Sequence, residues 1–165
     1  MSEPTPADAY TVASSFILAL DPSTTAVGWC YALAGNYIAS GVYKPKSNDL
    51  LGRMCMIRGW LETLLDSLEP VIVATEEPTG SHRNARTDRL LGMVAGIVLA
   101  ECGRAGIEFA FVHAMKVKAT GYCKDTAGDV ALLIGKETVG GDEADAVGVW
   151  RALVDERGWF GEIAE

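Results

Sequence analysis

The sequence predicts an α/β domain in which a mixed five-stranded sheet has helices on both faces. Short apolar segments bounded by turn residues alternate with longer segments of helical spacing. Their order is three strands, helix, strand, helix, strand, helix, and such alternation links strands through helices that pack on the sheet. Apolar residues make up 49% of the 165 residues, enough to build a sizeable core.

The first three predicted elements are strands. Residues 16–20 are a short apolar run that ends in an Asp-Pro-Ser turn signal. Residues 27–33 and 37–43 follow as strands, and the Ala-Gly-Asn sequence between them suits a hairpin turn. We therefore expect the chain to enter the sheet through neighbouring strands that are joined by short turns.

The rest of the chain alternates helices and strands. Segments in which apolar residues recur at helical spacing are separated by short apolar runs. Residues 116–126 lack either pattern and are expected to be irregular. The predicted elements are a helix at 49–68, a strand at 71–75, a helix at 88–103 that ends at a glycine, a strand at 108–112, a short helix at 129–135 and a helix at 141–157.

Length and composition favour one domain, expected over residues 16–158, between short tails at 1–15 and 159–165. The first tail is acidic and lacks the basic start of a signal peptide. No apolar run is long enough to span a membrane. The four cysteines are widely spaced and there are only two histidines, which disfavours a zinc site and a disulfide framework. We therefore expect a cytoplasmic protein.

Four carboxylates lie at the ends of separate apolar segments. Asp21 and Glu76 each follow an apolar strand, and Asp142 and Asp145 open the last helix. A carboxylate at the end of a buried strand is costly to desolvate unless a cation lies beside it. If the three segments converge, they build an oxygen-lined pocket for Mg²⁺, an ion that proteins use to break phosphodiester bonds. The four acids therefore indicate a metal-dependent nuclease.

The two strand-end acids also have structural interpretations. Asp21 before a proline is a common turn-forming residue, or the start of a phosphate-binding hairpin of the actin or sugar-kinase kind. Glu76 and Glu77 are charges of the sort found where a strand enters a loop. Since side chains alternate along a strand, the two glutamates cannot both face the core. Which of them would bind a metal stays open.

A purely structural role explains Asp142 better than it explains Asp145. Asp142 and Asp145 are three residues apart and share one face of the helix, while Glu143 points elsewhere. Acids in a first turn favour the helix dipole, and Asp142 is a natural N-cap. Asp145 fits that explanation less well, because small and apolar residues flank it on a helix that should pack on the sheet.

The net charge of −8 opposes a nucleic-acid partner, since most nucleic-acid binders are basic. Between residues 78 and 124, however, seven cations stand against three anions. Arginines at intervals of three among small polar residues suit a phosphate backbone, although a solvated loop and first helical turn would look the same. The candidate DNA-binding residues are Arg83, Arg86, Arg89, Lys116, Lys118 and Lys124.

Taken together, the acidic motifs resemble those of the RuvC-type Holliday junction resolvases, nucleases of the ribonuclease H-like superfamily. The similarity extends over about residues 16 to 155 and implies a ribonuclease H-like fold. The matching motifs are Asp21-Pro22 with Gly28 in the first strand and hairpin, Ala74-x-Glu76 in the second acidic motif, Asp142-x-x-Asp145-Ala in the last helix, and a Val-Lys-x-x-x-x-Gly-like segment that begins at Val117.

The resemblance implies a catalytic role for five residues. It assigns two Mg²⁺ ions, for which Mn²⁺ can substitute, to the four carboxylates Asp21, Glu76, Asp142 and Asp145. It places Lys118 near the scissile phosphate, where a cation offsets developing negative charge; an exposed loop lysine is the structural alternative. The implied reaction cuts a four-way junction or related branched DNA and leaves a 5′-phosphate and a 3′-hydroxyl.

The chain also departs from the family pattern. Ser23 replaces a glycine, and Lys124 is the candidate for a second basic position that falls near residues 127 and 128. Residues 78–87 contain no aromatic side chain, although the cellular resolvases use one there to open the junction. These departures favour a phage-type nuclease of relaxed selectivity, in a bacterial cytoplasm or a phage-infected host cell.

Helix 88–103 is apolar nearly all round, and Gly92, Gly96 and Ala100 form a ridge of small residues along it. A helix without a polar face is buried on two sides, either in a thick core or against a partner. Members of the resembling family are homodimers that use this helix region to cut two strands at symmetry-related points. The resemblance therefore predicts a homodimer through residues 88–103.

Two other functions stay open. A non-catalytic nucleic-acid-binding member of the fold is disfavoured because all four carboxylates are retained, and buried acids without a metal would destabilise the fold. An actin-like or sugar-kinase-type nucleotide-binding protein is disfavoured by the length of the chain and by the lack of a second phosphate-binding hairpin.

Overall fold

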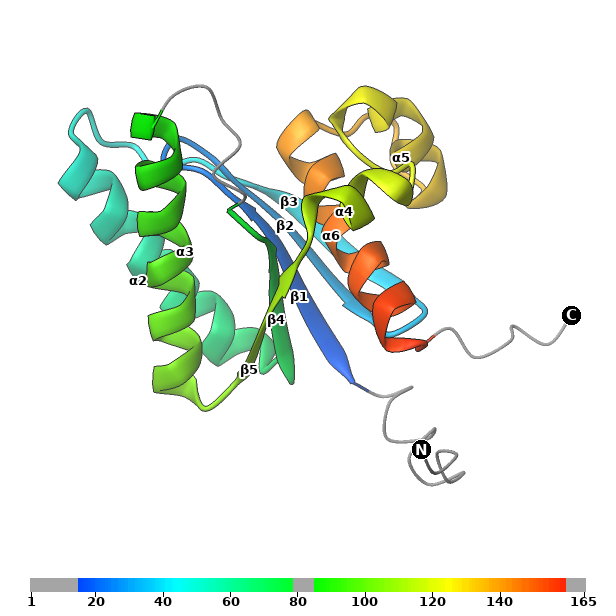
Figure 1. Cartoon of the computed structure of the whole chain (residues 1–165), viewed down its shortest axis with the longest axis horizontal. Coiled ribbons are helices and arrows are strands. Elements are labelled where there is room, and N and C mark those ends of the chain that lie inside the picture. Colours follow the sequence, from blue (N-terminus) through cyan, green and yellow to red (C-terminus); the bar gives the residue numbers. More distant parts are fainter. Residues whose placement is uncertain (1–14, 79–84, 160–165) are drawn as a thin grey trace, which may run out of the picture.

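The computed structural model describes residues 15–78 and 85–159 (Figure 1). Five strands form one sheet in the order β3-β2-β1-β4-β5. β1 pairs with β2 and β2 with β3 in antiparallel fashion, whereas β1-β4 and β4-β5 are parallel. The predicted mixed five-stranded sheet is thus confirmed. The strands are β1 Phe16–Pro22, β2 Val27–Leu33, β3 Tyr37–Tyr43, β4 Ile72–Glu76 and β5 Glu108–Val112.

Helices cover both faces of this sheet, as the sequence predicts (Figure 1). The helices α2 and α3 lie on one face, and α4, α5 and α6 lie on the other. None of the helices in the described ranges is long and apolar enough to cross a membrane. The helical elements are α2 Leu50–Leu68, α3 Ala85–Ala105, α4 Ala114–Ala119, the 3-10 turn η1 Lys124–Thr126, α5 Ala127–Leu133 and α6 Gly141–Arg157.

The alternation of side chains along β1 and β4 decides which face carries the acids. In β1, Ile17 and Ala19 belong to the core under α6, whereas Leu18 and Leu20 belong to the core under α2 and α3. Asp21 continues the first series, so its side chain belongs to the α6 face. Glu76 continues the corresponding series of β4 in the same way. Both strands therefore direct their terminal carboxylate toward α6.

Two glycines allow α6 to pack closely against its neighbours. A Cβ atom added to Gly28 of β2 would lie 1.8 Å from the backbone oxygen of Asp142. A Cβ atom added to Gly148 of α6 would lie 2.1 Å from the backbone oxygen of Tyr122. No larger residue fits at either position without moving backbone. These close contacts thus fix the distance of α6 from the sheet and from the segment before η1.

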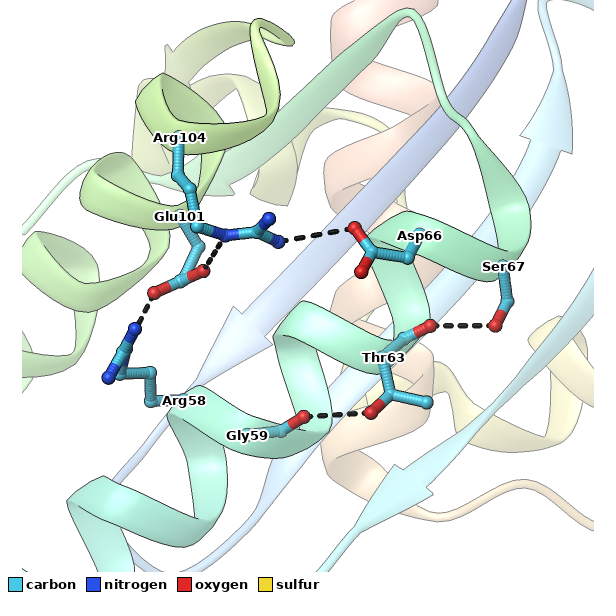
Figure 2. Close-up of polar contacts among 7 residues, drawn as sticks. All are labelled: Arg58, Gly59, Thr63, Asp66, Ser67, Glu101 and Arg104. Carbon is cyan, nitrogen blue, oxygen red and sulfur yellow. Dashed lines mark hydrogen bonds and ion pairs between the residues drawn. The ribbon is translucent and has the colours of Figure 1, made fainter.

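On the other face, a buried acid joins α2 to α3. Glu101 of α3 is 4% exposed and accepts hydrogen bonds from Nε of Arg58 at 2.7 Å and Nε of Arg104 at 2.6 Å (Figure 2). Arg104 also contacts Asp66 of α2 at 3.2 Å. The two arginine hydrogen bonds lower the pKa of Glu101, so the acid stays ionised at neutral pH.

Some predicted boundaries are wrong. Residues 116–126 are irregular only in part, because α4 occupies Ala114–Ala119 and η1 occupies Lys124–Thr126. The N-cap of α4 is His113, whose Nδ1 accepts from the N–H of Met115 at 3.2 Å. Helix α6 has the predicted range, but its N-cap is Gly140, whose backbone is extended, and not Asp142. Asp21 and Glu76 lie inside their strands rather than beyond them.

Candidate active site

A cavity of about 700 Å³ lies where β1 and β4 end, between α6 on one face of the sheet and the first half of α3 on the other. The five residues predicted to be catalytic all line it, together with Lys124. The lining residues that carry chemistry are Asp21, Ser23, Glu76, Glu77, Thr87, Lys118, Cys123, Lys124, Asp125, Asp142 and Asp145. Residues more than 120 positions apart in the chain thus meet at one site.

Strand pairing brings the two strand acids together. Leu20 of β1 pairs with Thr75 of β4 in the parallel register. Asp21 and Glu76 are the next residues along the two strands, so they lie side by side on the same face. Both Glu76 and Glu77 line the cavity, but Glu76 is partly buried and Glu77 is exposed. Glu76 is accordingly the stronger candidate for a metal ligand.

The two helical acids reach the cavity from the first turns of α6. Both line the cavity, which agrees with the shared face that their spacing of three residues predicts. Oδ1 of Asp145 accepts a hydrogen bond from the backbone N–H of Lys124 at 2.8 Å. The contact between Gly28 and the backbone of Asp142 sets how far this turn stands from the sheet.

The electrostatics of the cavity show that the acids repel one another. Burial, followed by the charges of Asp145, Glu76 and Asp142, raises the pKa of Asp21 to about 7, while the charge of Lys124 acts in the opposite direction. Burial also raises the pKa of Asp145, against the hydrogen bond and the charge of Lys124. A cation placed among these carboxylates would relieve both the repulsion and the cost of desolvation.

The donor set suits a hard divalent cation. Carboxylate oxygens are the ligands that Mg²⁺ prefers, and the four acids supply them from three elements. Within residues 15–78 and 85–159, no three acidic, histidine or cysteine side chains are already close enough together to enclose an ion. The chemistry of the residues therefore fits Mg²⁺ or Mn²⁺, provided that the acids draw together around it.

The candidate DNA-binding cations fall into three groups. Lys118 and Lys124 line the cavity. Arg86 and Arg89 are exposed in the first turns of α3, the helix whose Thr87 also lines the cavity. The others are less closely tied to the cavity: Lys116 of α4 forms a 3.0 Å surface ion pair with Glu156 of α6, and Arg83 lies outside the described residues.

Sequence reasoning misses two residues that line the cavity and the ion pair of one residue beside it. Asp125 and Cys123 line the cavity because η1 folds against α6, a contact that no local pattern predicts. Glu143 is buried and forms an ion pair with Lys136. Its place on the sheet-facing side of a buried helix is the one signal that could have marked it as paired.

Comparison with known proteins relates this arrangement to solved structures. No protein-family model and no curated protein matches the chain. The structure of Thermus thermophilus RuvC in complex with a Holliday junction substrate superposes with a TM-score of 0.75 and 20% identity, over 87% of this chain and 96% of that one. The chain has the RuvC-type fold.

Two further structures agree with this result. A second T. thermophilus RuvC structure gives a TM-score of 0.71 at 20% identity, over 87% of this chain and 96% of that one. The yeast mitochondrial Holliday junction resolvase Ydc2 gives 0.59 at 11% identity, over 88% of this chain and 80% of that one. The ribonuclease H-like fold implied by the acidic motifs is therefore confirmed. The RuvC-type fold here carries its cavity at the ends of the central strands.

Proposed function

We propose that the chain is a divalent-metal-dependent endonuclease that cuts Holliday junctions or related branched DNA. The observation that carries this proposal is the convergence of Asp21, Glu76, Asp142 and Asp145, with two lysines, in one cavity of a RuvC-type fold. Acids without a metal would leave this cavity poorly stabilised, because each raises the cost of ionising the others. Enzymes that hydrolyse phosphodiester bonds use clustered carboxylates of this kind to hold divalent metal ions.

The four carboxylates would hold two Mg²⁺ ions, and Mn²⁺ would substitute for them. When bound, the metal supplies Lewis-acid activation for an in-line hydrolysis that leaves a 5′-phosphate and a 3′-hydroxyl. The protein groups act around it. Lys118 and Lys124 offset the negative charge that develops on the phosphate, and the N–H of Lys124 keeps the Asp145 carboxylate turned toward the cavity.

The DNA would approach over α3 and the segment from α4 to η1. Arg86 and Arg89 project from the first turns of α3, and Lys118 and Lys124 stand at the cavity on the other face of the sheet. Cations on both sides of a cavity bind a phosphate backbone without reading bases. Lys116 can exchange Glu156 for a phosphate at little cost, since exposed ion pairs contribute little stability. Arg83 stays a candidate DNA contact from the sequence alone.

We also propose that the protein is a homodimer through the region of residues 88–103. Met93, Gly96, Ile97 and Ala100 of α3 form an apolar groove of about 560 Å³ with α2 residues Leu50, Leu51 and Met54. Leu51 is 74% exposed and Met93 49%. A Cβ atom added to Gly92 or Gly96 would meet only open space, so the ridge of small residues faces outward. A second copy would cover this surface.

The proposed setting is the cytoplasm of a bacterium or of a phage-infected host cell. All four cysteines are free thiols, as a reducing compartment requires. The lack of an aromatic residue at 78–87, where the cellular resolvases use one to open the junction, favours a phage-type enzyme that accepts several branched substrates.

The test uses a labelled synthetic four-way junction and a matched linear duplex, each incubated with the protein with and without Mg²⁺. Paired symmetric nicks in the junction alone, lost in Asp21→Asn, are the expected result. Binding of the junction without cleavage, by a folded protein that still binds Mg²⁺, would instead identify a non-catalytic member of the fold. Stabilisation by ATP with neither property would favour a nucleotide-binding protein.

A further inference from the structure

A second charged cluster lies beside the cavity but does not line it. Glu143 of α6 is 7% exposed, and Oγ of Ser40 in β3 donates to its Oε1 at 2.5 Å. Nζ of Lys136 forms an ion pair with the same oxygen. Lys136 also donates to the backbone oxygen of Ser40 at 2.8 Å and to its Oγ at 3.2 Å. The three residues form a closed network, which we call the Glu143 cluster.

The Glu143 cluster joins three separate parts of the fold. Ser40 belongs to an edge strand of the sheet, Lys136 to the connection between α5 and α6, and Glu143 to the first turn of α6. The hydroxyl of Tyr37 lies 3.0 Å from Oγ of Ser40 and extends the network along β3. The start of α6 is thereby attached both to the sheet and to the connection that precedes it.

The first turn of α6 needs such an attachment because its N-cap residue provides no side-chain hydrogen bond. The N-cap is Gly140, which has no side chain to accept a hydrogen bond from the first turn. Successive helical residues are about 100° apart, so Asp142 and Asp145 lie about 60° apart on the helix. Glu143 lies about 100° from Asp142. Tying Glu143 to β3 therefore sets the rotation of α6 that points the two aspartates into the cavity.

Stability alone does not account for a charged pair at this place. Buried ion pairs are often no more stable than apolar residues of similar size, because both charges must leave water. Neighbouring positions on the same helix, such as Ala144, Ala146 and Val147, pack on the sheet as apolar side chains. Hydrogen bonds and ion pairs are directional, whereas apolar contacts are not. The Glu143 cluster therefore holds the helix at one rotation about its axis.

We propose that Glu143, held by Ser40 and Lys136, is a positioning residue for the metal-binding acids of α6. The proposal rests on the proposed function, since it concerns the same cavity. Glu143 does not touch DNA or metal in this scheme. It acts through the rotation of the first turn, which decides whether Asp142 and Asp145 can close around a cation together with Asp21 and Glu76.

The experiment compares Glu143→Gln and Lys136→Met with the wild-type full chain in a Mn²⁺ titration followed by thermal unfolding. The expected result is a metal midpoint about tenfold higher in both variants, the range found when groups that orient metal ligands are lost. Junction binding in EDTA should be unchanged. Single-turnover cleavage at limiting Mg²⁺ should fall in parallel and recover at high Mg²⁺.

A matched control comes from the other face of the sheet. Glu101 is also a buried acid with two cationic partners, but it joins α2 to α3 and lies away from the cavity (Figure 2). Glu101→Gln should lower the melting temperature and leave the metal midpoint at the wild-type value. A merely structural role for Glu143 would give the same pattern in Glu143→Gln, and that result would overturn the proposal.

Two more variants separate the possible failures. The double variant Glu143→Leu with Lys136→Met removes both charges and should keep the fold; a wild-type metal midpoint in it would also overturn the proposal. Asp21→Asn is the negative reference for the metal-dependent shift in melting temperature. If the wild-type chain shows no such shift and does not cut the junction, the proposed function itself fails. If the wild type responds to metal and the Glu143 variants have the same metal midpoint, the positioning role is rejected and the proposed function stands.

Discussion

The backbone N–H of Lys124 donates a 2.8 Å hydrogen bond to Oδ1 of Asp145, so the turn η1 is tied to a carboxylate of the cavity. The side chain of Lys124 lines the same cavity. Its charge lowers the pKa of Asp21, which burial and three neighbouring acids raise. Through its backbone and its side chain, Lys124 therefore links the position of the Asp145 carboxylate to that of a cation in the same cavity.

This relationship makes Asp145→Asn an informative variant. The amide oxygen of asparagine can still accept from the N–H of Lys124, so the fold and junction binding should persist. Loss of a carboxylate ligand should lower single-turnover cleavage of a four-way junction at least about 100-fold. Circular dichroism and a gel-shift assay in EDTA check fold and binding. Cleavage near the wild-type rate would contradict a metal site at these acids.

The raised pKa of Asp21 predicts how stability depends on pH in metal-free buffer. The folded state holds a proton on Asp21 up to a pH of about 7, whereas the unfolded chain loses it near its ordinary value of 3.8. The folded state thus binds more protons between these limits, and this group's contribution to stability falls as the pH rises through that window. Denaturant unfolding in EDTA from pH 5 to pH 8 measures the slope.

Asp21→Asn is the matching substitution. It should remove this part of the slope and stabilise the metal-free protein at pH 8 by about 1–3 kcal/mol, with a smaller gain at pH 5. Millimolar Mg²⁺ or Mn²⁺ should stabilise the wild type at pH 8 and the variant much less. An identical pH slope in the two proteins would show that Asp21 does not carry the repulsion.

Much of this architecture could be predicted from local pattern. The five strands are short apolar runs with clear turn residues, and each lies within one or two residues of its predicted range. The acids could be assigned to one site because strand ends and a first helical turn are recognisable without knowing their contacts. The RuvC-type fold follows from the same motifs and is matched by the structural comparison.

What could not be predicted depends on contacts distant in sequence. Ser40 and Glu143 are 103 residues apart, so no local pattern announces their hydrogen bond. The helix α4 is only six residues long, too short for an apolar period, and its His113 cap and packing on α6 make it a helix. The range of α6 was predicted correctly, but its N-cap was not, because Asp142 suits an N-cap by residue type whereas the extended backbone of Gly140 provides it.

The contact between Gly28 and Asp142 predicts a severe effect of a single methyl group. In Gly28→Ala the new Cβ would lie 1.8 Å from the backbone oxygen of Asp142, so β2 and α6 must separate. We expect a loss of about 2–4 kcal/mol in the free energy of unfolding and a weaker metal response. Gly35→Ala is the control, since its Cβ would meet nothing within 4 Å. Equal stability of the two variants would refute this packing.

The apolar groove between α2 and α3 predicts the oligomeric state. Gly96→Arg places a charge where an added Cβ would meet open space, so the variant should fold as a monomer, whereas the wild type should sediment as a dimer. Analytical ultracentrifugation measures this. A dimer is also expected to make paired nicks, so the monomeric variant should lose coordinated cutting while keeping its metal-dependent thermal shift.

The control for that variant is Leu132→Arg. Leu132 of α5 is an exposed apolar residue, 80% accessible, on the opposite face of the sheet from the groove. If exposure of apolar surface alone drove self-association, both substitutions would weaken it equally. We expect Leu132→Arg to remain dimeric, because the ridge of Gly92, Gly96 and Ala100 lets two α3 helices approach closely and α5 offers no such ridge. A wild-type monomer at micromolar concentration would remove the dimer from the proposal, without bearing on the cavity.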